Sequence, residues 1–172
     1  MEKTEKTRLW NSIVKHATPL KQPYRKLVAS TITNYKTEFM NLPLTDNGKY
    51  SEDGGLLHAT SDLVSLAFGI KDVINVDFDL LLAAAMLFFI GTTKRKELQD
   101  AGIDTDTPLP LNVYTSILLM EQAKELETCN EEFQKKQYEK ELYKLINIFM
   151  SDNDHIKEKT ILNHLQQISF MD

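Results

Sequence analysis

The chain has 172 residues, 42% hydrophobic and 26% charged, a balance that excludes general disorder and suffices for one domain with a buried core. Six glycines and five prolines are few for an all-β protein, which needs many tight turns. The charge is unevenly spread: residues 1–40 hold eight Lys or Arg and three Glu (+5), whereas residues 41–172 hold twelve Lys or Arg and 22 Asp or Glu (−10). The acidic body disfavours broad binding to nucleic acid, although the basic amino-terminal part is able to contact a phosphate or an acidic partner.

The cysteine content and one apolar run limit where the chain is expected to work. A single cysteine, Cys129, excludes an internal disulfide and fits a reducing compartment, so we expect a cytoplasmic protein. The start, MEKTEKTRLW, is charged and has no apolar run behind it, unlike a secretory signal peptide. The apolar run Leu80–Ile90 is shorter than the roughly 20 residues that cross a bilayer. We therefore expect no membrane association and interpret this run as a buried core helix.

Apolar residues recur at the spacing of an α-helix along most of the chain, and no segment alternates as a β-strand does. Prolines and clusters of Gly, Asn and Asp separate the periodic segments. The fold predicted is all-α, a single-domain bundle of about seven helices over residues 1–172. In chain order the spacing predicts helices over 5–16, 24–40, 55–68, 78–90, 111–127, 130–150 and 157–170.

Chemically active side chains are sparse and poorly grouped. None of the four histidines has the spacing of a metal site, and the chain contains no phosphate-binding loop, nucleophile elbow or zinc-type cysteine pair. His58 and Asp62 are four residues apart on the helix predicted over 55–68. Their face is rotated by about 100° from Ala59, which lies on the apolar stripe, so we expect the pair to face solvent.

The segment GGLLHATSDLV, which begins at Gly54, is followed downstream by AAAMLFFIG, which ends at Gly91. Together they resemble the HD phosphohydrolase superfamily, whose members are all-helical, metal-dependent hydrolases of phosphate esters. The chain looks most similar to the HD domains of bacterial 3′-to-5′ exoribonucleases and to relaxase-associated HD domains. YRKLVASTITNYKTEFMNLP is similar to the helix and loop that precede the first histidines of that group. The resemblance covers about residues 20–172 and implies an HD-like helical bundle.

The metal-binding positions implied by the resemblance are where this chain departs from the family. His58 stands one position before the place of a family histidine and is differently oriented on the helix. The glycines and apolar residues of the scaffold survive, from Gly54 to Leu57 and at Ile90 and Gly91. The family's ligands and the lysine that follows its His-Asp pair fall on Lys49, Tyr50, Ala59, Phe88, Phe89, Thr92 and, for the late Asp, near Gln166.

These replacements remove the chemistry that a metal site needs. A divalent cation requires carboxylate or imidazole donors at about 2.0–2.6 Å, and phenyl rings and a methyl group offer none. Phe88 and Phe89 can fill the vacated volume without burying an unpaired charge, and Lys49 would add a positive charge near the lost metal. We therefore expect no catalytic residue, no metal and no cofactor. The alternative is that the two phenylalanines are ordinary core residues of an unrelated helical protein.

The first functional hypothesis is a catalytically inactive HD-fold protein that acts by binding, as a regulator, inhibitor or adaptor of a protein partner. Homo-oligomers are compatible with it. The second is a nucleic-acid or nucleotide binder that uses the old cleft and the basic amino-terminal part, although the net charge disfavours it. Its possible anion-binding residues are Lys49, Lys94, Arg95 and Lys96. Such a basic triplet at 94–96 is more often the exposed start of the next segment.

The third hypothesis is a residual metal-dependent phosphodiesterase with relocated ligands. It would have to recruit His58, Asp62, Glu52 and Asp53 from the loop and the exposed helix face.

Overall fold

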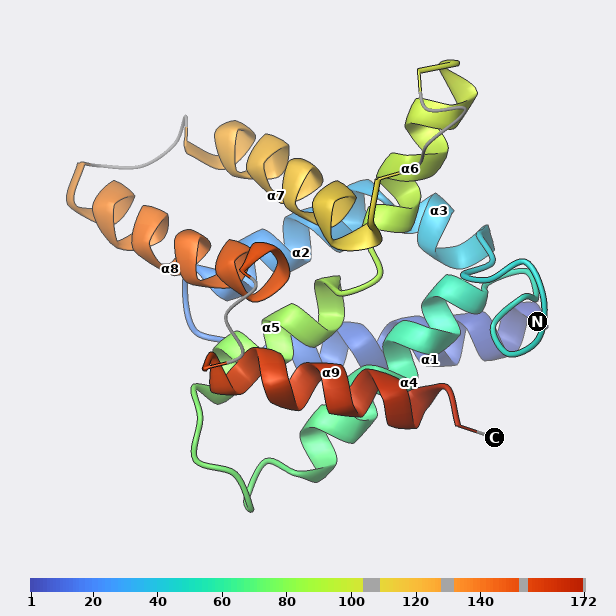
Figure 1. Cartoon of the computed structure of the whole chain (residues 1–172), viewed down its shortest axis with the longest axis horizontal. Helices are drawn as coiled ribbons and strands as arrows, with labels where there is room; N and C mark the ends of the chain where they lie inside the picture. The colour runs from blue at the N-terminus through green and yellow to red at the C-terminus, as the bar shows by residue number, and fades with distance from the viewer. Residues whose placement is uncertain (104–108, 128–131, 152–154, 172) are drawn as a thin grey trace.

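Every regular element in the described part of the chain is an α-helix, as the sequence predicts (Figure 1). The computed structural model describes residues 1–103, 109–127, 132–151 and 155–171, without the side chains of 125–127 and 132–137; Cys129 lies outside the described residues. Nine helices lie within these ranges, and eight of them contribute residues to one hydrophobic core. The nine helices are α1 (Lys3–Ala17), α2 (Tyr24–Asn34), α3 (Lys36–Asn41), α4 (Gly55–Gly69), α5 (Phe78–Leu87), α6 (Gly91–Asp100), α7 (Leu111–Glu127), α8 (Glu132–Met150) and α9 (Lys157–Ser169).

Helix α5 lies at the centre of the bundle. It packs against α2, α4, α8 and α9, and all its residues from Leu80 to Leu87 are buried. The side chain of Asp77 caps its amino end by accepting a hydrogen bond from the Leu80 N–H at 3.2 Å. The prediction of a buried core helix in this segment is confirmed. Within the described ranges, no helix combines the length and the apolar character needed to cross a bilayer.

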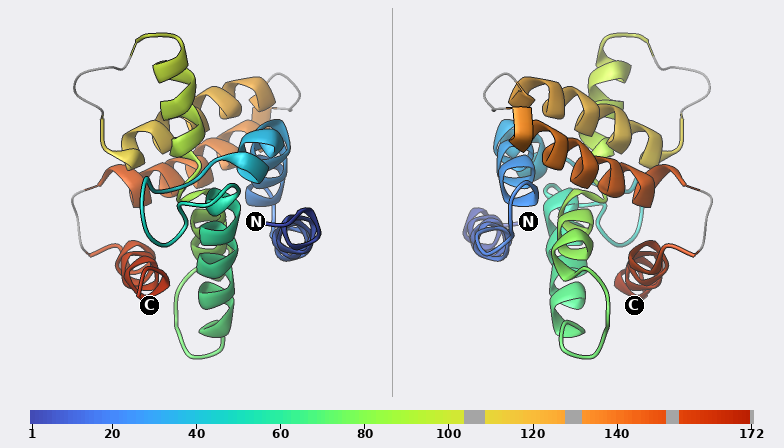
Figure 2. Two further views of the ribbon diagram at one scale, coloured as in Figure 1. Left: turned by 90° about the vertical axis from the view of Figure 1, so that its right-hand side faces the viewer. Right: turned by 90° about the vertical axis from the view of Figure 1, so that its left-hand side faces the viewer.

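The other helices surround α5 in two groups. Helices α7 and α8 contact each other on one side, and α6 packs against α7 (Figure 1). Helices α1 and α9 lie on opposite sides of α4, which contacts both (Figure 2). The carboxyl end of α5 and the start of α6 therefore pass between α9 and the α7–α8 pair.

Two predicted helices end earlier than the sequence indicates, and each is followed by a further helix, which raises the number of helices. The helix predicted over 24–40 is divided at Tyr35, whose φ of −105° and ψ of 24° interrupt the helical backbone. The helix predicted over 78–90 ends at Leu87, and a tight turn at 88–90 leads directly into α6. In this turn the N–H groups of Ile90 and Thr93 bond to carbonyls three residues back, as in a 3₁₀-helix.

The two glycines before α4 are required by the backbone. Gly54 has φ +84°, a left-handed conformation that other residues rarely adopt. Gly55 lies so close to the preceding loop that a Cβ atom there would be 2.0 Å from the carbonyl oxygen of Tyr50. The pair thus positions the 42–54 loop against the start of α4.

Candidate functional site: a cavity beside Phe88 and Phe89

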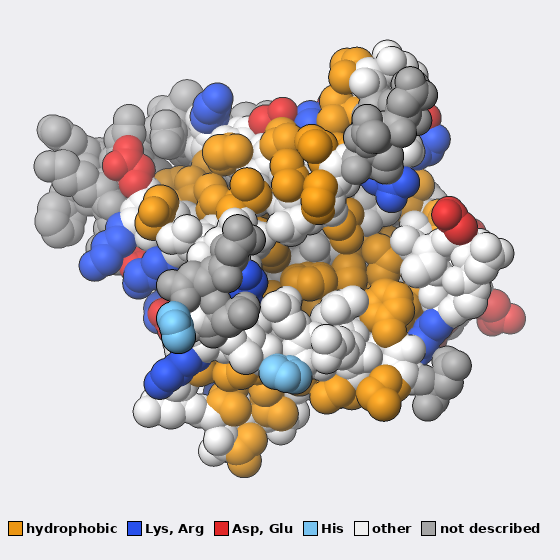
Figure 3. Space-filling view, viewed as in Figure 1, with side chains coloured by type: hydrophobic (Ala, Val, Ile, Leu, Met, Phe, Trp, Pro, Cys, Tyr) orange, Lys and Arg blue, Asp and Glu red, His pale blue; other side chains and the backbone are white. Residues whose placement is uncertain are grey.

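A cavity of about 500 Å³ opens where the turn after α5 meets α9 and the ends of α7 and α8. Figure 3 shows hydrophobic side chains gathered in a hollow on this face of the molecule. We call it the Phe88–Phe89 cavity. Its lining residues are Leu44, Thr45, Phe88, Phe89, Leu111, Asn112, Ile148, Phe149, Ser151, Lys159, Asn163, Gln166 and Phe170.

Aromatic rings form a continuous row along this cavity. The ring of Phe88 lies 6.2 Å from that of Phe149 and 4.9 Å from that of Phe89, measured between centroids. Phe89 is 6.1 Å from Phe170, which in turn is 5.2 Å from Tyr50. Most of these pairs meet edge to face, the geometry that the charge distribution of aromatic rings favours. Phe89 is only 2% exposed, whereas Phe88 is partly exposed.

Polar groups of α7, α9 and the end of α8 also line the cavity. Lys159 donates from Nζ to the carbonyl oxygen of Ser151, at the end of α8. The amide of Asn112 donates to the carbonyl oxygen of Phe149 at 2.8 Å. The side chains of Asn163 and Gln166 have no hydrogen-bond partner among the described residues. Lys159 is the only charged side chain in the described lining.

Three of the positions singled out by the sequence meet in this cavity, since Phe88, Phe89 and Gln166 all line it. Tyr50 reaches the same row of rings through its contact with Phe170. The other predicted positions lie around it. Ala59 is fully buried on α4. Thr92 lies in the first turn of α6, where its N–H bonds to the carbonyl oxygen of Phe89 at 3.1 Å. Lys49 is partly exposed in the 42–54 loop.

Lys49 does not supply the positive charge of the cavity. Its Nζ donates to the carbonyl oxygen of Met171 at 3.0 Å and lies 5.4 Å from the ring centroid of Tyr50, outside the cavity lining. Lys159 contributes that charge instead. Sequence reasoning missed Lys159 and Asn163, although their spacing with Gln166 and Phe170 places all four on one face of α9.

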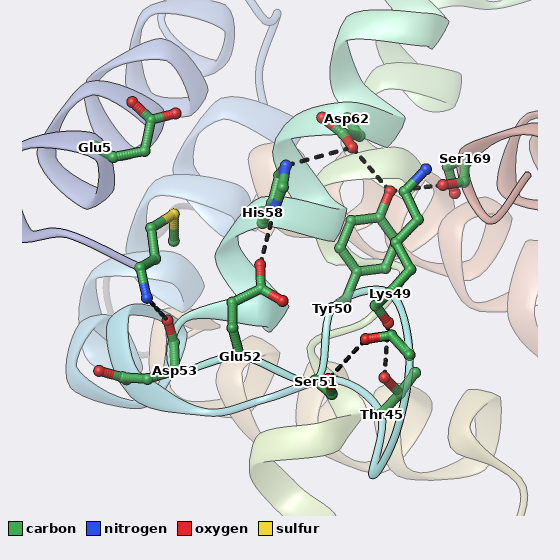
Figure 4. Close-up of polar contacts among 12 residues, drawn as sticks. Glu5, Thr45, Lys49, Tyr50, Ser51, Glu52, Asp53, His58, Asp62 and Ser169 are labelled. Carbon is green, nitrogen blue, oxygen red and sulfur yellow. Dashed lines mark hydrogen bonds and ion pairs between the residues drawn. The ribbon is translucent and has the colours of Figure 1, made fainter. Parts of the chain in front are cut away.

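A second polar cluster joins the 42–54 loop to α4 and α9 (Figure 4). Tyr50, in a left-handed conformation with φ +66°, lies with its hydroxyl 2.8 Å from Asp62 and 2.6 Å from the carbonyl oxygen of Ser169. His58 Nδ1 lies 2.8 Å from Glu52, and its Nε2 lies 3.7 Å from Asp62. Burial and the Asp62 carboxylate raise the pKa of Tyr50, whereas the hydrogen bond from His58 lowers the pKa of Glu52.

This cluster has the wrong geometry for a relocated metal centre. Glu52 and Asp62 meet different nitrogens of the His58 ring, so their donors do not converge on one point. Asp53 points elsewhere and pairs with Lys6 at 2.8 Å. No group of three or more His, Cys, Asp or Glu suited to a metal ion occurs among the residues that the structure describes. The pair expected to face solvent, His58 and Asp62, is half-exposed but engaged in these contacts.

The exposure that the sequence favours for the basic triplet at 94–96 holds for Arg95 and Lys96 but not for Lys94. The triplet lies within α6, and Lys94 is 7% exposed, with its Nζ 3.1 Å from Glu97 and 2.9 Å from Glu121. Burial lowers the pKa of Lys94, but the bonds to these two carboxylates raise it by more. Lys96 pairs with Asp100, and Arg95 is exposed. Acidic neighbours therefore satisfy two of the three cations.

Comparison of the chain with family models, with curated proteins and with solved structures found no match. The fold and the site thus define an all-α protein with a preformed cavity lined by aromatic rings, amides and one lysine.

Proposed function

We propose that this chain is a catalytically inactive protein of the HD phosphohydrolase type, which acts by binding as a regulator, inhibitor or adaptor of a protein partner. The observation that carries the proposal is the Phe88–Phe89 cavity. It forms around the positions where the resemblance puts the His-Asp pair and the late Asp of the family, and its described lining has no carboxylate and no imidazole.

The chemistry of the lining opposes a metal and favours recognition. Phenyl rings cannot coordinate a divalent cation, and the ammonium of Lys159 repels one. Binding pockets are typically concave sites of 300–1,000 Å³, and this cavity, with a volume of about 500 Å³ and a mixed apolar and polar lining, falls within that range. Aromatic side chains that pack against one another give such a site a defined shape and reduce the cost of ordering side chains on binding.

A metal and turnover assay tests the catalytic half of the proposal. The purified chain is incubated with Mn²⁺, desalted, analysed for bound metal and assayed with bis(p-nitrophenyl) phosphate. We expect no stoichiometric metal and no turnover. Bound metal with turnover that His58→Ala abolishes would overturn the proposal in favour of the relocated-ligand phosphodiesterase. The control is His164→Ala, which removes an exposed histidine of α9 outside the cavity lining.

A paired capture experiment tests the binding half. Asn163 and Gln167 are both exposed on α9, but only Asn163 lines the cavity. Asn163→Trp should therefore obstruct the cavity, while Gln167→Trp adds the same side chain outside it. We expect a host protein that the wild type and Gln167→Trp retain and Asn163→Trp loses. Capture that Asn163→Trp leaves unchanged would contradict the role assigned to the cavity.

A further inference from the structure

We propose that the Phe88–Phe89 cavity binds a small ligand with a flat aromatic body and one anionic substituent, and that Lys159 recognises the anion. This inference rests on the proposed function, because it uses the same cavity, but it goes beyond a protein partner to a small-molecule ligand.

The shape and lining of the cavity define the body of the ligand. Phe88, Phe89, Phe149 and Phe170 present ring edges and faces along one side, where a planar aromatic group gains offset or edge-to-face contacts. The volume of about 500 Å³ accommodates one fused ring system with substituents.

The positive charge of Lys159 in the lining defines the charged substituent of the ligand. Lys159 uses one of its three N–H donors on the carbonyl oxygen of Ser151 and forms no ion pair within the described residues. The adjacent carboxylate on α9, Glu158, is engaged elsewhere, since it accepts a hydrogen bond from the Asp77 N–H at 3.0 Å. Among the described residues, Lys159 thus has no carboxylate partner, and it lies beside a cavity whose other described lining residues are uncharged.

Two amides complete the polar side of the site. Asn163 and Gln166 follow Lys159 on the same face of α9, and neither side chain has a hydrogen-bond partner in the described part of the chain. Each amide offers both a donor and an acceptor to polar edges of a ring system. The aromatic row and this polar row lie on the lining of one cavity, which matches an amphipathic ligand better than a purely apolar one.

The test uses two dyes with the same rings and different charge. N-phenyl-1-naphthylamine is neutral, and 8-anilinonaphthalene-1-sulfonate is the same ring system with one sulfonate. Both are titrated by fluorescence into the wild type, Lys159→Met and Asn163→Trp, with Lys157→Met and Gln167→Trp as matched controls on exposed positions of α9 outside the lining. Circular dichroism verifies that each variant is folded.

We expect the sulfonate dye to bind the wild type about tenfold more tightly than the neutral dye, the scale of one charge-assisted hydrogen bond. Lys159→Met should remove this advantage, Asn163→Trp should weaken both dyes, and the two controls should change neither. Equal affinities of the dyes, both weakened by Asn163→Trp, would refute anion recognition while leaving the cavity as a binding site. Dye binding insensitive to Asn163→Trp would overturn this inference and also count against the proposed function.

Discussion

Gly55→Ala tests how the backbone of the 42–54 loop is fixed against α4. An added Cβ would lie 2.0 Å from the carbonyl oxygen and 2.6 Å from the carbonyl carbon of Tyr50, so the loop backbone has to move. That oxygen accepts hydrogen bonds from the N–H groups of Leu44 at 2.9 Å and Thr45 at 3.4 Å, and the shift strains both. The same shift displaces Tyr50 from Asp62 and from Ser169.

The expected loss of stability combines two destabilising contributions with one stabilising contribution. Overpacking costs about 1–3 kcal/mol, and a lost backbone hydrogen bond costs about 1 kcal/mol more. Replacing glycine by alanine stabilises the fold by roughly 0.4–1 kcal/mol, because it reduces the conformational entropy of the unfolded chain. We expect the free energy of unfolding to fall by about 1–3 kcal/mol, which lowers Tm by roughly 3–10 °C in a chain of this length.

Chemical and thermal denaturation followed by circular dichroism measure this loss. Gly69→Ala is the control, because Gly69 also lies in α4 and a Cβ there would meet no atom within 4 Å. The control should be neutral or slightly more stable than the wild type. If Gly55→Ala is as stable as Gly69→Ala, the loop is not fixed by close contact at Gly55 and the reasoning fails.

Tyr24→Phe removes a buried 2.5 Å hydrogen bond to Glu141 that joins α2 to α8. We expect denaturant titration to show that the free energy of unfolding falls by about 1.5–3 kcal/mol. Unchanged stability would contradict the role of this bond. Burial raises the pKa of Glu141, but hydrogen bonds from Tyr24 and Lys144 lower it by more. The pKa of Glu141 in the folded state therefore lies below 4.5. The stabilisation is therefore complete above pH 4.5 and lost as the pH falls through the folded value, and Glu141→Gln should lose less stability than the wild type between pH 5 and pH 3. Phe89→Ala should cost about 3–5 kcal/mol and Phe88→Ala clearly less, because only Phe89 is almost fully buried; equal costs in a denaturation assay would argue against the burial of Phe89.

The helical fold was predictable because apolar periodicity depends on local sequence. The positions at which two of the predicted helices end were not predictable. Tyr35 lies in a segment with no proline or glycine and with continuous apolar spacing, so no local sequence signal marks the interruption there. Gly91 ends an apolar run in the sequence, yet it starts α6, and its backbone there lies close to α7. An added Cβ would be 2.5 Å from the Leu111 carbonyl oxygen. The close approach at Gly91 joins segments far apart in the chain, which local periodicity does not detect.

The aromatic half of the site was accessible from the sequence, whereas the polar half was not. Phe88, Phe89 and Gln166 were selected by the resemblance, and they line one cavity. Lys159 and Asn163 lie on the polar face of α9, which periodicity assigns to solvent. Only the position of α9 beside the end of α8 turns part of that face towards a cavity. Lys49, selected for its charge, is instead held at the carboxyl end of α9 by the Met171 carbonyl oxygen.

The most direct measurement of the central claim is a Mn²⁺ titration of the ¹⁵N-labelled chain followed by NMR. A paramagnetic ion broadens the amide signals of residues close to it. Because the Phe88–Phe89 cavity is lined by rings, amides and a lysine, we predict no selective broadening of Thr45, Phe89 and Gln166 at stoichiometric Mn²⁺. Selective loss of these three signals at one equivalent would place a metal ion in the cavity and contradict the account.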